Sequence, residues 1–305
     1  MTDQDSTADA ILKTADELFQ ASDHLAAQEQ YHEAYRRARE EFNRPVEVEA
    51  ACQMARMCLV LGKPQDGRDW LTEAANKATE SDLMGWSRYL GVKGRFEWKA
   101  QELDAARLTF QQMYTYCKVN DIGSRAVDAA NMCAIVAATP EEQIAWSRRG
   151  IEMAENNDSE QWLGPLWNNL AATYFDIKQY SEALSCYLKA REYHWRFSDE
   201  RAKLMADYQI GMTYRLLEKY DEAACWLRPS LAWAERLDDH VAIGQVSQDL
   251  GEVEIAKGNR QSGLNLLVQS RDAYEQARYP QECPEIWKAI NDHIEQLRDE
   301  SLTQD

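Results

Sequence analysis

A small residue recurs along this chain at a nearly constant interval of about 40 positions. The series runs through Ala27, Gly67, Ala106, Gln143, Ala183, Ala223 and Gly263, with Gln143 as its one larger member. A second series lies twelve residues earlier, at Ala15, Ala55, Gly94, Asn131, Ala171, Gly211 and Gly251. Two small residues at this spacing fit a pair of antiparallel helices joined by a tight turn, where only Ala or Gly lets the backbones approach closely. The interval therefore predicts an all-α chain built from repeated helix pairs.

The fifth repeat shows the pattern most clearly. Its first half carries one stripe of large and small residues, Trp167, Leu170, Ala171 and Tyr174. Its second half carries a matching stripe, Tyr180, Ala183, Tyr187 and Ala190. Steps of three and four place each stripe on one helix face, and Lys178-Gln179 forms a short polar turn between them. This order resembles the tetratricopeptide repeat (TPR), a family of helix–turn–helix repeats.

The resemblance covers residues 8–278 as seven repeats and implies a right-handed superhelical solenoid. The period is about 40 residues instead of the family's usual 34 or so, which predicts longer helices closed by short turns. Residues 279–299 are assigned to the capping helix: Tyr279-Pro280 breaks the chain, and the helix is expected from Glu285 to about Asp299, with Pro284 at its start. A cap is needed because the last repeat of a solenoid otherwise exposes its apolar side. We expect residues 1–7 and 300–305 to be disordered.

Composition excludes several classes of function. The chain has 52 acidic and 34 basic residues, and its net charge of -18 argues against nucleic-acid and anionic-membrane partners, which need clustered cations. No stretch reaches the roughly twenty apolar residues of a membrane helix, and the N-terminus lacks the pattern of a signal peptide. The seven cysteines and five histidines show no metal-ligand spacing. We therefore expect a cytoplasmic protein without a metal or other cofactor, and we predict no particular oligomeric state.

In the family that this chain resembles, the first helices of successive repeats line a concave groove that holds ligands. Four positions around each small residue of the earlier series share one face of the first helix, because their steps are three, four and three. In repeats two to four this face and its immediate neighbours provide Arg56, Arg88, Arg95, Trp98, Lys99, Arg125 and Met132. Arginine forks match carboxylates, and Trp98 offers a surface for stacking, so the pattern predicts binding of an acidic or C-terminal protein segment.

The corresponding residues of repeats five and six are more apolar. They are Asn168, Asn169, Phe175, Tyr208 and Met212. The amides are able to bond a peptide backbone, and the larger side chains to hold hydrophobic groups. A second interpretation fits the same residues equally well. Arginines on such a face often pair with the next helix, and methionine or aromatic side chains often belong to the core between repeats.

Two functions follow from the resemblance. The first is a non-catalytic adaptor that binds another protein or peptide in the groove. The alternative is a regulatory receptor of a short signalling peptide that controls a separate effector protein. An enzyme is disfavoured, because the sequence has no nucleophile motif, phosphate loop or metal set. In repeat four, Asn131 and Gln143 replace both small residues, so that either this helix pair stands further apart or the pitch of the solenoid changes locally.

Overall fold

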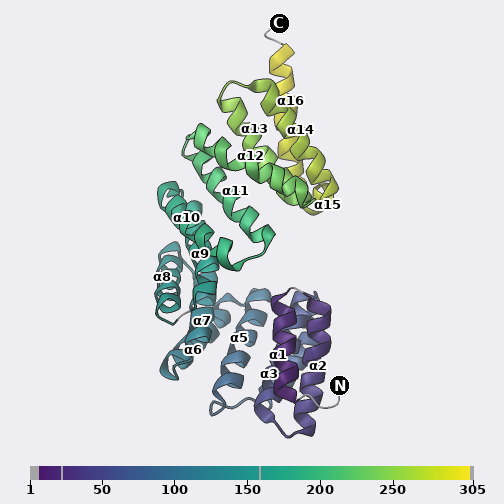
Figure 1. Ribbon diagram of the computed structural model, residues 1–305, viewed down its shortest axis with the longest axis vertical. Coiled ribbons are helices and arrows are strands. Elements are labelled where there is room, and N and C mark those ends of the chain that lie inside the picture. The colour runs from purple at the N-terminus through teal and green to yellow at the C-terminus, as the bar shows by residue number, and fades with distance from the viewer. Residues whose placement is uncertain (1–6, 22, 158, 303–305) are drawn as a thin grey trace. The chain divides into compact units, whose positions relative to one another are not determined.

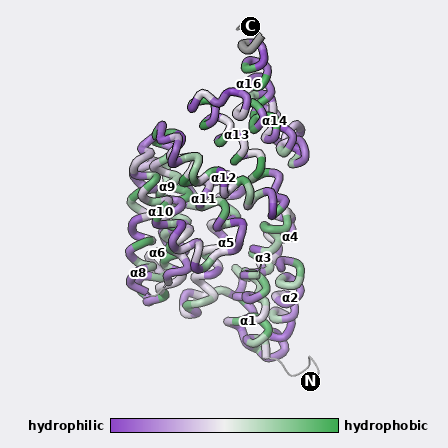
Figure 2. The backbone as a smooth tube through the Cα atoms, turned by 45° about the horizontal axis from the view of Figure 1, so that its top comes forward, coloured by the Kyte–Doolittle hydropathy of each residue, from purple (hydrophilic) through white to green (hydrophobic). Residues whose placement is uncertain are grey.

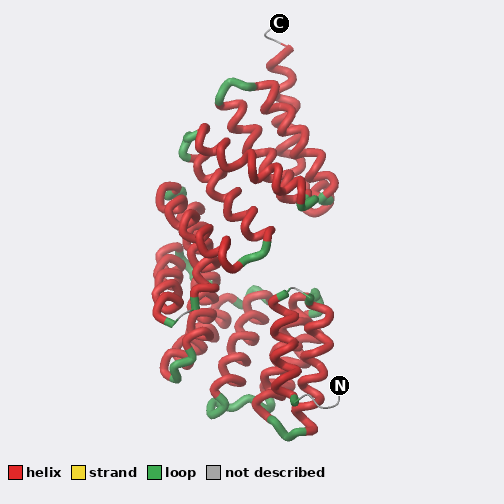
Figure 3. Tube along the Cα trace, viewed as in Figure 1, coloured by secondary structure: helices red, strands yellow, loops and turns green. Residues whose placement is uncertain are grey.

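The computed structural model describes residues 7–21, 23–157 and 159–302, and this part of the chain is helical throughout apart from short connections, with no strand (Figure 3). Seven helix pairs follow one another in chain order (Figure 1). They are α1 (Ala8–Gln20) with α2 (His24–Glu40), α3 (Arg44–Val60) with α4 (Pro64–Ala75), α5 (Leu83–Lys99) with α6 (Leu103–Val119), α7 (Gly123–Ile135) with α8 (Pro140–Asn156), α9 (Leu163–Asp176) with α10 (Tyr180–Phe197), α11 (Glu200–Leu216) with α12 (Tyr220–Arg236), and α13 (His240–Ala256) with α14 (Arg260–Gln276). The predicted all-α class and the seven repeats are confirmed.

The helices gather into two compact units, residues 1–158 and 159–305. The first unit contains α1 to α8, and the second contains α9 to α16. The division falls between repeats four and five, where the short 3-10 helix η2 (Glu160–Trp162) precedes α9. The period of the sequence does not reveal this division, because the repeat pattern resumes directly after it.

The small residues lie where the two helices of a pair approach each other. A Cβ added at Gly67 of α4 would stand 3.0 Å from the carbonyl oxygen of Ala55 in α3. One added at Gly263 of α14 would stand 2.8 Å from the carbonyl oxygen of Gly251 in α13. Both distances are too short for a larger side chain, which confirms that the series marks close helix contacts.

Repeat four departs from this arrangement as its sequence does. Asn131 is buried in α7, whereas Gln143 of α8 is half-buried. The helix α7 has 13 residues, against 17 in α3 and α5, which accounts for the shorter step in this repeat.

Most turns place one residue in the left-handed backbone region. In the turn after α5, Gln101 has φ of 63°, and the N–H of Glu102 reaches back to the carbonyl of Glu97 at 2.9 Å. This is the Schellman arrangement, which satisfies carbonyls at the helix end. The predicted turn at Lys178 belongs to the same class, with φ of 61°. Residues of this kind are Phe42, Gly62, Gln101, Asp121, Lys178, Glu218, Asp238, Gly258 and Arg278.

Hydropathy alternates between hydrophobic and hydrophilic along the labelled helices (Figure 2). The alternation is weakest in helices that are covered on several sides. In α3 and α13, for example, most residues are buried, whereas α4 buries only Gly67 and Ala74. In repeats two and seven the first helix of the pair therefore contributes more to the core than the second.

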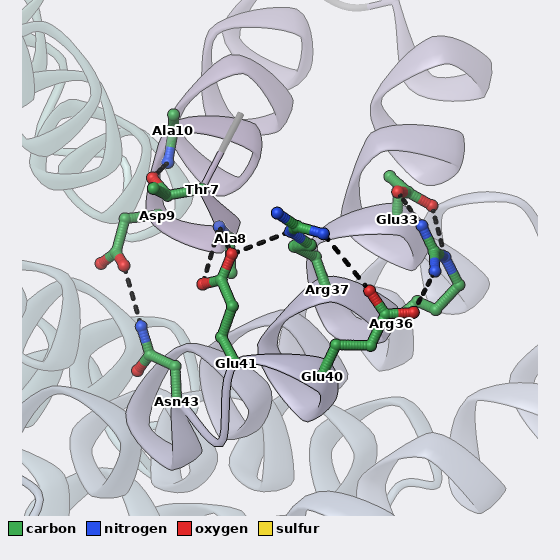
Figure 4. A network of polar contacts seen from close by, with 10 residues as sticks. All are labelled: Thr7, Ala8, Asp9, Ala10, Glu33, Arg36, Arg37, Glu40, Glu41 and Asn43. Carbon is green, nitrogen blue, oxygen red and sulfur yellow. Dashed lines mark hydrogen bonds and ion pairs between the residues drawn. The ribbon is translucent and has the colours of Figure 1, made fainter. Parts of the chain in front are cut away.

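A polar network ties the start of α1 to the turn after α2 (Figure 4). The carboxylate of Glu41 accepts the backbone N–H of Ala8 at 3.2 Å and the Nε of Arg37 at 2.9 Å. Close by, the amide of Asn43 donates to Asp9 at 2.8 Å. Of the N-terminal segment expected to be disordered, residues 1–6 lie outside the described residues, and residue 7 caps α1.

The C-terminal region contains α15 (Tyr279–Glu282) and α16 (Pro284–Leu302). The helix expected from Glu285 to about Asp299 corresponds to α16, and the region expected to break the chain at Tyr279-Pro280 forms the short helix α15. The apolar stripe of α16 packs on α14, where Ile290 and Ile294 join Leu267 and Tyr274 in one buried cluster. The helix continues through residue 302, beyond the expected end at 299, and residues 303–305 lie outside the described part of the chain.

Candidate functional site

The candidate residues of repeats two to four belong to the first unit, on α3, α5 and α7. Consecutive first helices pack together there, α1 against α3 and α3 against α5. Polar side chains of these helices meet across the packing. We call the side that carries Phe19, Arg56, Arg88 and Arg95 the arginine face.

Glu49 of α3 is the central acceptor beneath this face. It is only 8 % exposed, and its Oε1 accepts Nε of Arg88 at 2.9 Å and also contacts Arg125. Burial opposes the ionisation of Glu49, but the two guanidinium groups together hold its pKa below the ordinary value. One carboxylate therefore holds arginines from two different helices, α5 and α7.

Arg125 lies deeper than its position on the predicted groove suggested. It is 8 % exposed and also donates to the carbonyl of Met84 at 2.5 Å and to the hydroxyl of Ser87 at 3.1 Å. Together with Glu49, these partners engage both terminal nitrogens of its guanidinium. We therefore assign Arg125 to the packing between helices and not to a contact surface.

Arg95 is held in a similar way. Its guanidinium donates to Asp128 at 2.7 Å and to the carbonyl of Gly91 at 2.9 Å. Burial would raise the pKa of Asp128, but the charge of Arg95, supported by Arg56 and Arg88, lowers it. Asp128 is thus a charged partner fixed within the face.

Arg56 of α3 differs from the other three. Its guanidinium carbon lies 4.4 Å from the ring centroid of Phe19 in α1. Among the residues that the structure describes, no carboxylate forms an ion pair with it. Burial lowers the pKa of Arg56 to about 10, and repulsion from Arg95 and Arg88 adds to this. Arg56 is therefore a half-buried cation that stacks on an aromatic ring and lacks an acidic partner.

A third carboxylate borders the face from α1. Asp16 accepts the hydroxyl of Tyr31 at 2.6 Å and the amide of Gln53 at 2.9 Å. Burial, with Asp16, raises the pKa of Tyr31, so this hydroxyl remains a donor. Asp16 and Phe19 occupy the predicted face positions of repeat one, where the sequence signal was present although neither was selected. Tyr31 lies on a second helix, which face positions of first helices do not include.

The other candidates of the first unit divide between surface and core. Lys99 is exposed and its Nζ lies 4.9 Å from the ring centroid of Trp98, which is half-buried against the core. Met132 is 4 % exposed and lies in that core beside Cys133. Met132 is therefore a packing residue.

The candidates of the second unit are mostly packing residues as well. Tyr208 is 8 % exposed and donates to Asp249 at 2.8 Å, while Met212 packs against the same core. Phe175 contacts the ring of Tyr180 edge-on at 5.4 Å between centroids.

The asparagines of repeat five lie in α9. Asn168 and Asn169 are both half-buried, and the carbonyl of Asn169 accepts the hydroxyl of Thr173 at 3.1 Å. The residue that sequence reasoning missed in this unit is Asp249, which is buried and also pairs with Arg215 at 2.7 Å. It lies one position from the face residue Gln248, so the spacing alone did not select it.

The residues that the structure describes contain no cluster of His, Cys, Asp and Glu able to hold a metal ion. None of their helices has the length and apolar character needed to cross a bilayer.

Comparisons with known proteins agree with this architecture. The family model described as tetratricopeptide repeat matches residues 164–192. No curated protein matches the chain. Among solved structures, the chain is similar to a signal-transduction ATPase with numerous domains and a tetratricopeptide-repeat sensor from Pyrococcus horikoshii, at 16 % identity and a TM-score of 0.73. That match covers 95 % of this chain but 44 % of the other, so this chain spans less than half of its length.

Two other structures are similar over most of both chains. The apo form of RapI shows 15 % identity and a TM-score of 0.71, covering 88 % of this chain and 77 % of the other. A Rap conjugation gene regulator from a plasmid, in complex with a Phr peptide, shows 17 % identity and a TM-score of 0.59, covering 89 % and 74 %. At these identities the likeness concerns the fold.

Proposed function

Because the chain is a protein of tetratricopeptide repeats, we propose that it is a non-catalytic adaptor that binds a segment of another protein on the arginine face of its first unit. The observation that carries the proposal is Arg56, a half-buried cation without an acidic partner among the described residues. A cation in this position gains a partner when an acidic segment binds, and a partner is worth more where water is partly excluded.

Binding of an array of short peptides of random sequence tests the proposal. We expect wild type to bind a subset of peptides, and Arg56→Glu to lose this binding. Arg68→Glu is the matched control, because Arg68 is exposed on α4, the second helix of the same repeat, and the change in charge is identical. Loss of binding in both variants, or in neither, would contradict a site on the arginine face.

Charge reversal at Arg95 or Arg125 is a poorer test. Each guanidinium is paired with a mostly buried carboxylate, Asp128 or Glu49. A glutamate at either position would place like charges together and destabilise the unit, so lost binding would not identify a contact residue.

The second candidate is a receptor for a short signalling peptide that controls a separate effector. The likeness to the Rap regulator solved with its Phr peptide favours it, since the match covers 89 % of this chain. This candidate predicts that a bound peptide makes the chain more compact. Small-angle scattering with and without a peptide selected from the array would measure the radius of gyration. An unchanged radius of gyration at saturating peptide would contradict the receptor and leave the adaptor as the remaining candidate.

A further inference from the structure

We infer that Arg56 anchors a single carboxylate of the bound segment, from an aspartate or glutamate side chain or from a chain terminus. The inference rests on the proposed function and names the chemistry of its ligand. It also distinguishes the arginines: Arg56 contacts the ligand, while Arg88 and Arg95 remain paired with Glu49 and Asp128.

The contact with Phe19 leaves Arg56 able to bind. A guanidinium above an aromatic ring uses its face for that contact, and its N–H donors point outward from its edges. The distance of 4.4 Å from the guanidinium carbon to the ring centroid is within the range of such contacts. A carboxylate matches two of these donors at once.

The acidic groups near Arg56 are already engaged elsewhere. Asp128 accepts from Arg95 at 2.7 Å, and Asp16 accepts from Tyr31 and Gln53 at 2.6 and 2.9 Å. Among the described residues, neither group forms a hydrogen bond or ion pair with Arg56, although the charge of Asp128 acts on it. A carboxylate from outside the chain would supply the direct partner that Arg56 lacks.

The balance of charge favours a monoanion. Four guanidinium groups, Arg56, Arg88, Arg95 and Arg125, face three carboxylates, Asp16, Glu49 and Asp128. One carboxylate from a ligand makes the cluster neutral. A phosphate with two charges would exceed the surplus and would lie close to three fixed carboxylates.

The test uses the full chain labelled with ¹⁵N-arginine, observed by NMR through the Nε–Hε signals of the arginines. The probes are N-acetylglutamate α-amide, which carries a side-chain carboxylate, and N-acetylalanine, which carries a terminal one. N-acetylglutamine α-amide is the uncharged match to the first probe, and inorganic phosphate is the competing anion. We expect the Arg56 signal to shift saturably with at least one of the carboxylates, which identifies the source, and to stay unchanged with the glutamine amide.

Variants separate contact from general attraction. Arg56→Gln should weaken binding about tenfold, as expected for a lost charge-assisted pair, with the Arg88 and Arg95 signals as reporters. Arg68→Gln, which removes an exposed charge on α4, should change binding less than about twofold. Thermal unfolding would show that both variants remain folded, and Arg56→Lys replaces Arg56→Gln if the latter does not.

Two outcomes would overturn the inference: phosphate binding more tightly than either carboxylate, or equal weakening by Arg56→Gln and Arg68→Gln. These outcomes are independent of the peptide array. Peptides that bind without any carboxylate would leave the adaptor standing and reject the anchor. Saturable binding of N-acetylglutamate α-amide, with no peptide bound on the array, would support the anchor and reject the adaptor.

Discussion

Phe42 occupies the turn between α2 and α3 with φ of 57°, a backbone conformation that is unfavourable for a bulky side chain. Its side chain is 93 % exposed, so it gains little from packing. We expect Phe42→Gly to raise the free energy of unfolding by about 1 kcal/mol, since glycine adopts this region without steric cost. Urea unfolding of the two proteins would measure the difference. Phe42→Ala keeps the strained backbone and should give no such gain, so equal stabilisation by both changes would contradict this explanation.

Glu49, unlike the exposed Phe42, is buried and pairs with two arginines, so its replacement should destabilise the protein. Glu49→Gln would leave Arg88 and Arg125 as buried charges without their shared carboxylate. We expect a loss of about 3–5 kcal/mol in the stability of the first unit, measured by urea unfolding. The control is Glu33→Gln on α2, where the exposed pair with Arg36 should contribute less than about 1 kcal/mol. A small effect at Glu49 would show that the pair does not hold α3 and α5 together.

The same carboxyl group predicts a dependence on pH. Its pKa is lowered in the folded state, so the stabilisation it provides is complete above its unfolded pKa, near 4.3 or so, and is lost as the pH falls through the lower folded value. Acid titration of stability in wild type and Glu49→Gln should show a smaller decrease in the variant. Parallel decreases would mean that other groups account for the acid sensitivity.

At the scale of single residues, the sequence predicts position better than role. The repeat interval predicted Arg56, Arg88 and Arg95 on one face, and in the structure the charges of Arg88 and Arg95 act on Arg56. It did not reveal which arginine lacks a partner. That depends on Asp128 and Glu49 reaching across helices, and on Tyr31 holding Asp16, all of which are contacts between distant positions.

At the scale of helices, the polar turns between repeats show which capping contacts the local sequence predicts and which it does not. Asn43, Asp82, Asp199 and Asp239 cap the following helix through their side chains, as turn residues of this kind are expected to do. Asn120 instead donates to the carbonyl of Tyr116 at 2.9 Å in the preceding helix. An asparagine is able to do either, so its sequence position locates the turn without fixing the partner.

Pro229 in the middle of α12 is a local defect that can be corrected. It has no N–H to donate to the carbonyl of Cys225, and both residues are exposed. We expect Pro229→Ala to stabilise the protein by about 1–3 kcal/mol, since proline is the least favourable residue within a helix. Pro45→Ala is the control, because Pro45 lies in the first turn of α3, where no such bond is lost. Thermal unfolding of both variants should show a clear rise in Tm only for Pro229→Ala.

At the scale of the whole molecule, the series of small residues predicted the class of fold and the number of repeats. It could not predict the two units, because the interval of about 40 residues continues unchanged from repeat four to repeat five, across η2 and the division between the units. A repeat pattern records what neighbouring helices require of each other. It does not record how a longer array divides.

The stacking of repeats also predicts which helices are destabilised by a substitution at the C-terminal end. Ile294 of α16 is 2 % exposed against α14, and Ile294→Ser should cost about 2–4 kcal/mol. Because repeats contact mainly their neighbours, hydrogen exchange should accelerate in α14 and α16 while α1 to α8 keep their protection. Ile286→Ser on the same helix is the control, since Ile286 is 44 % exposed. Faster exchange throughout both units would contradict local coupling.

The contact of Arg125 with Glu49 has a mechanical consequence. It joins residues 76 positions apart and connects α7 to α3, so it spans the repeat that lies between them. An array in which each repeat touches only the next can fray stepwise from its ends. A bond that skips a repeat makes three of them melt together, and repeats two to four should resist fraying as one block.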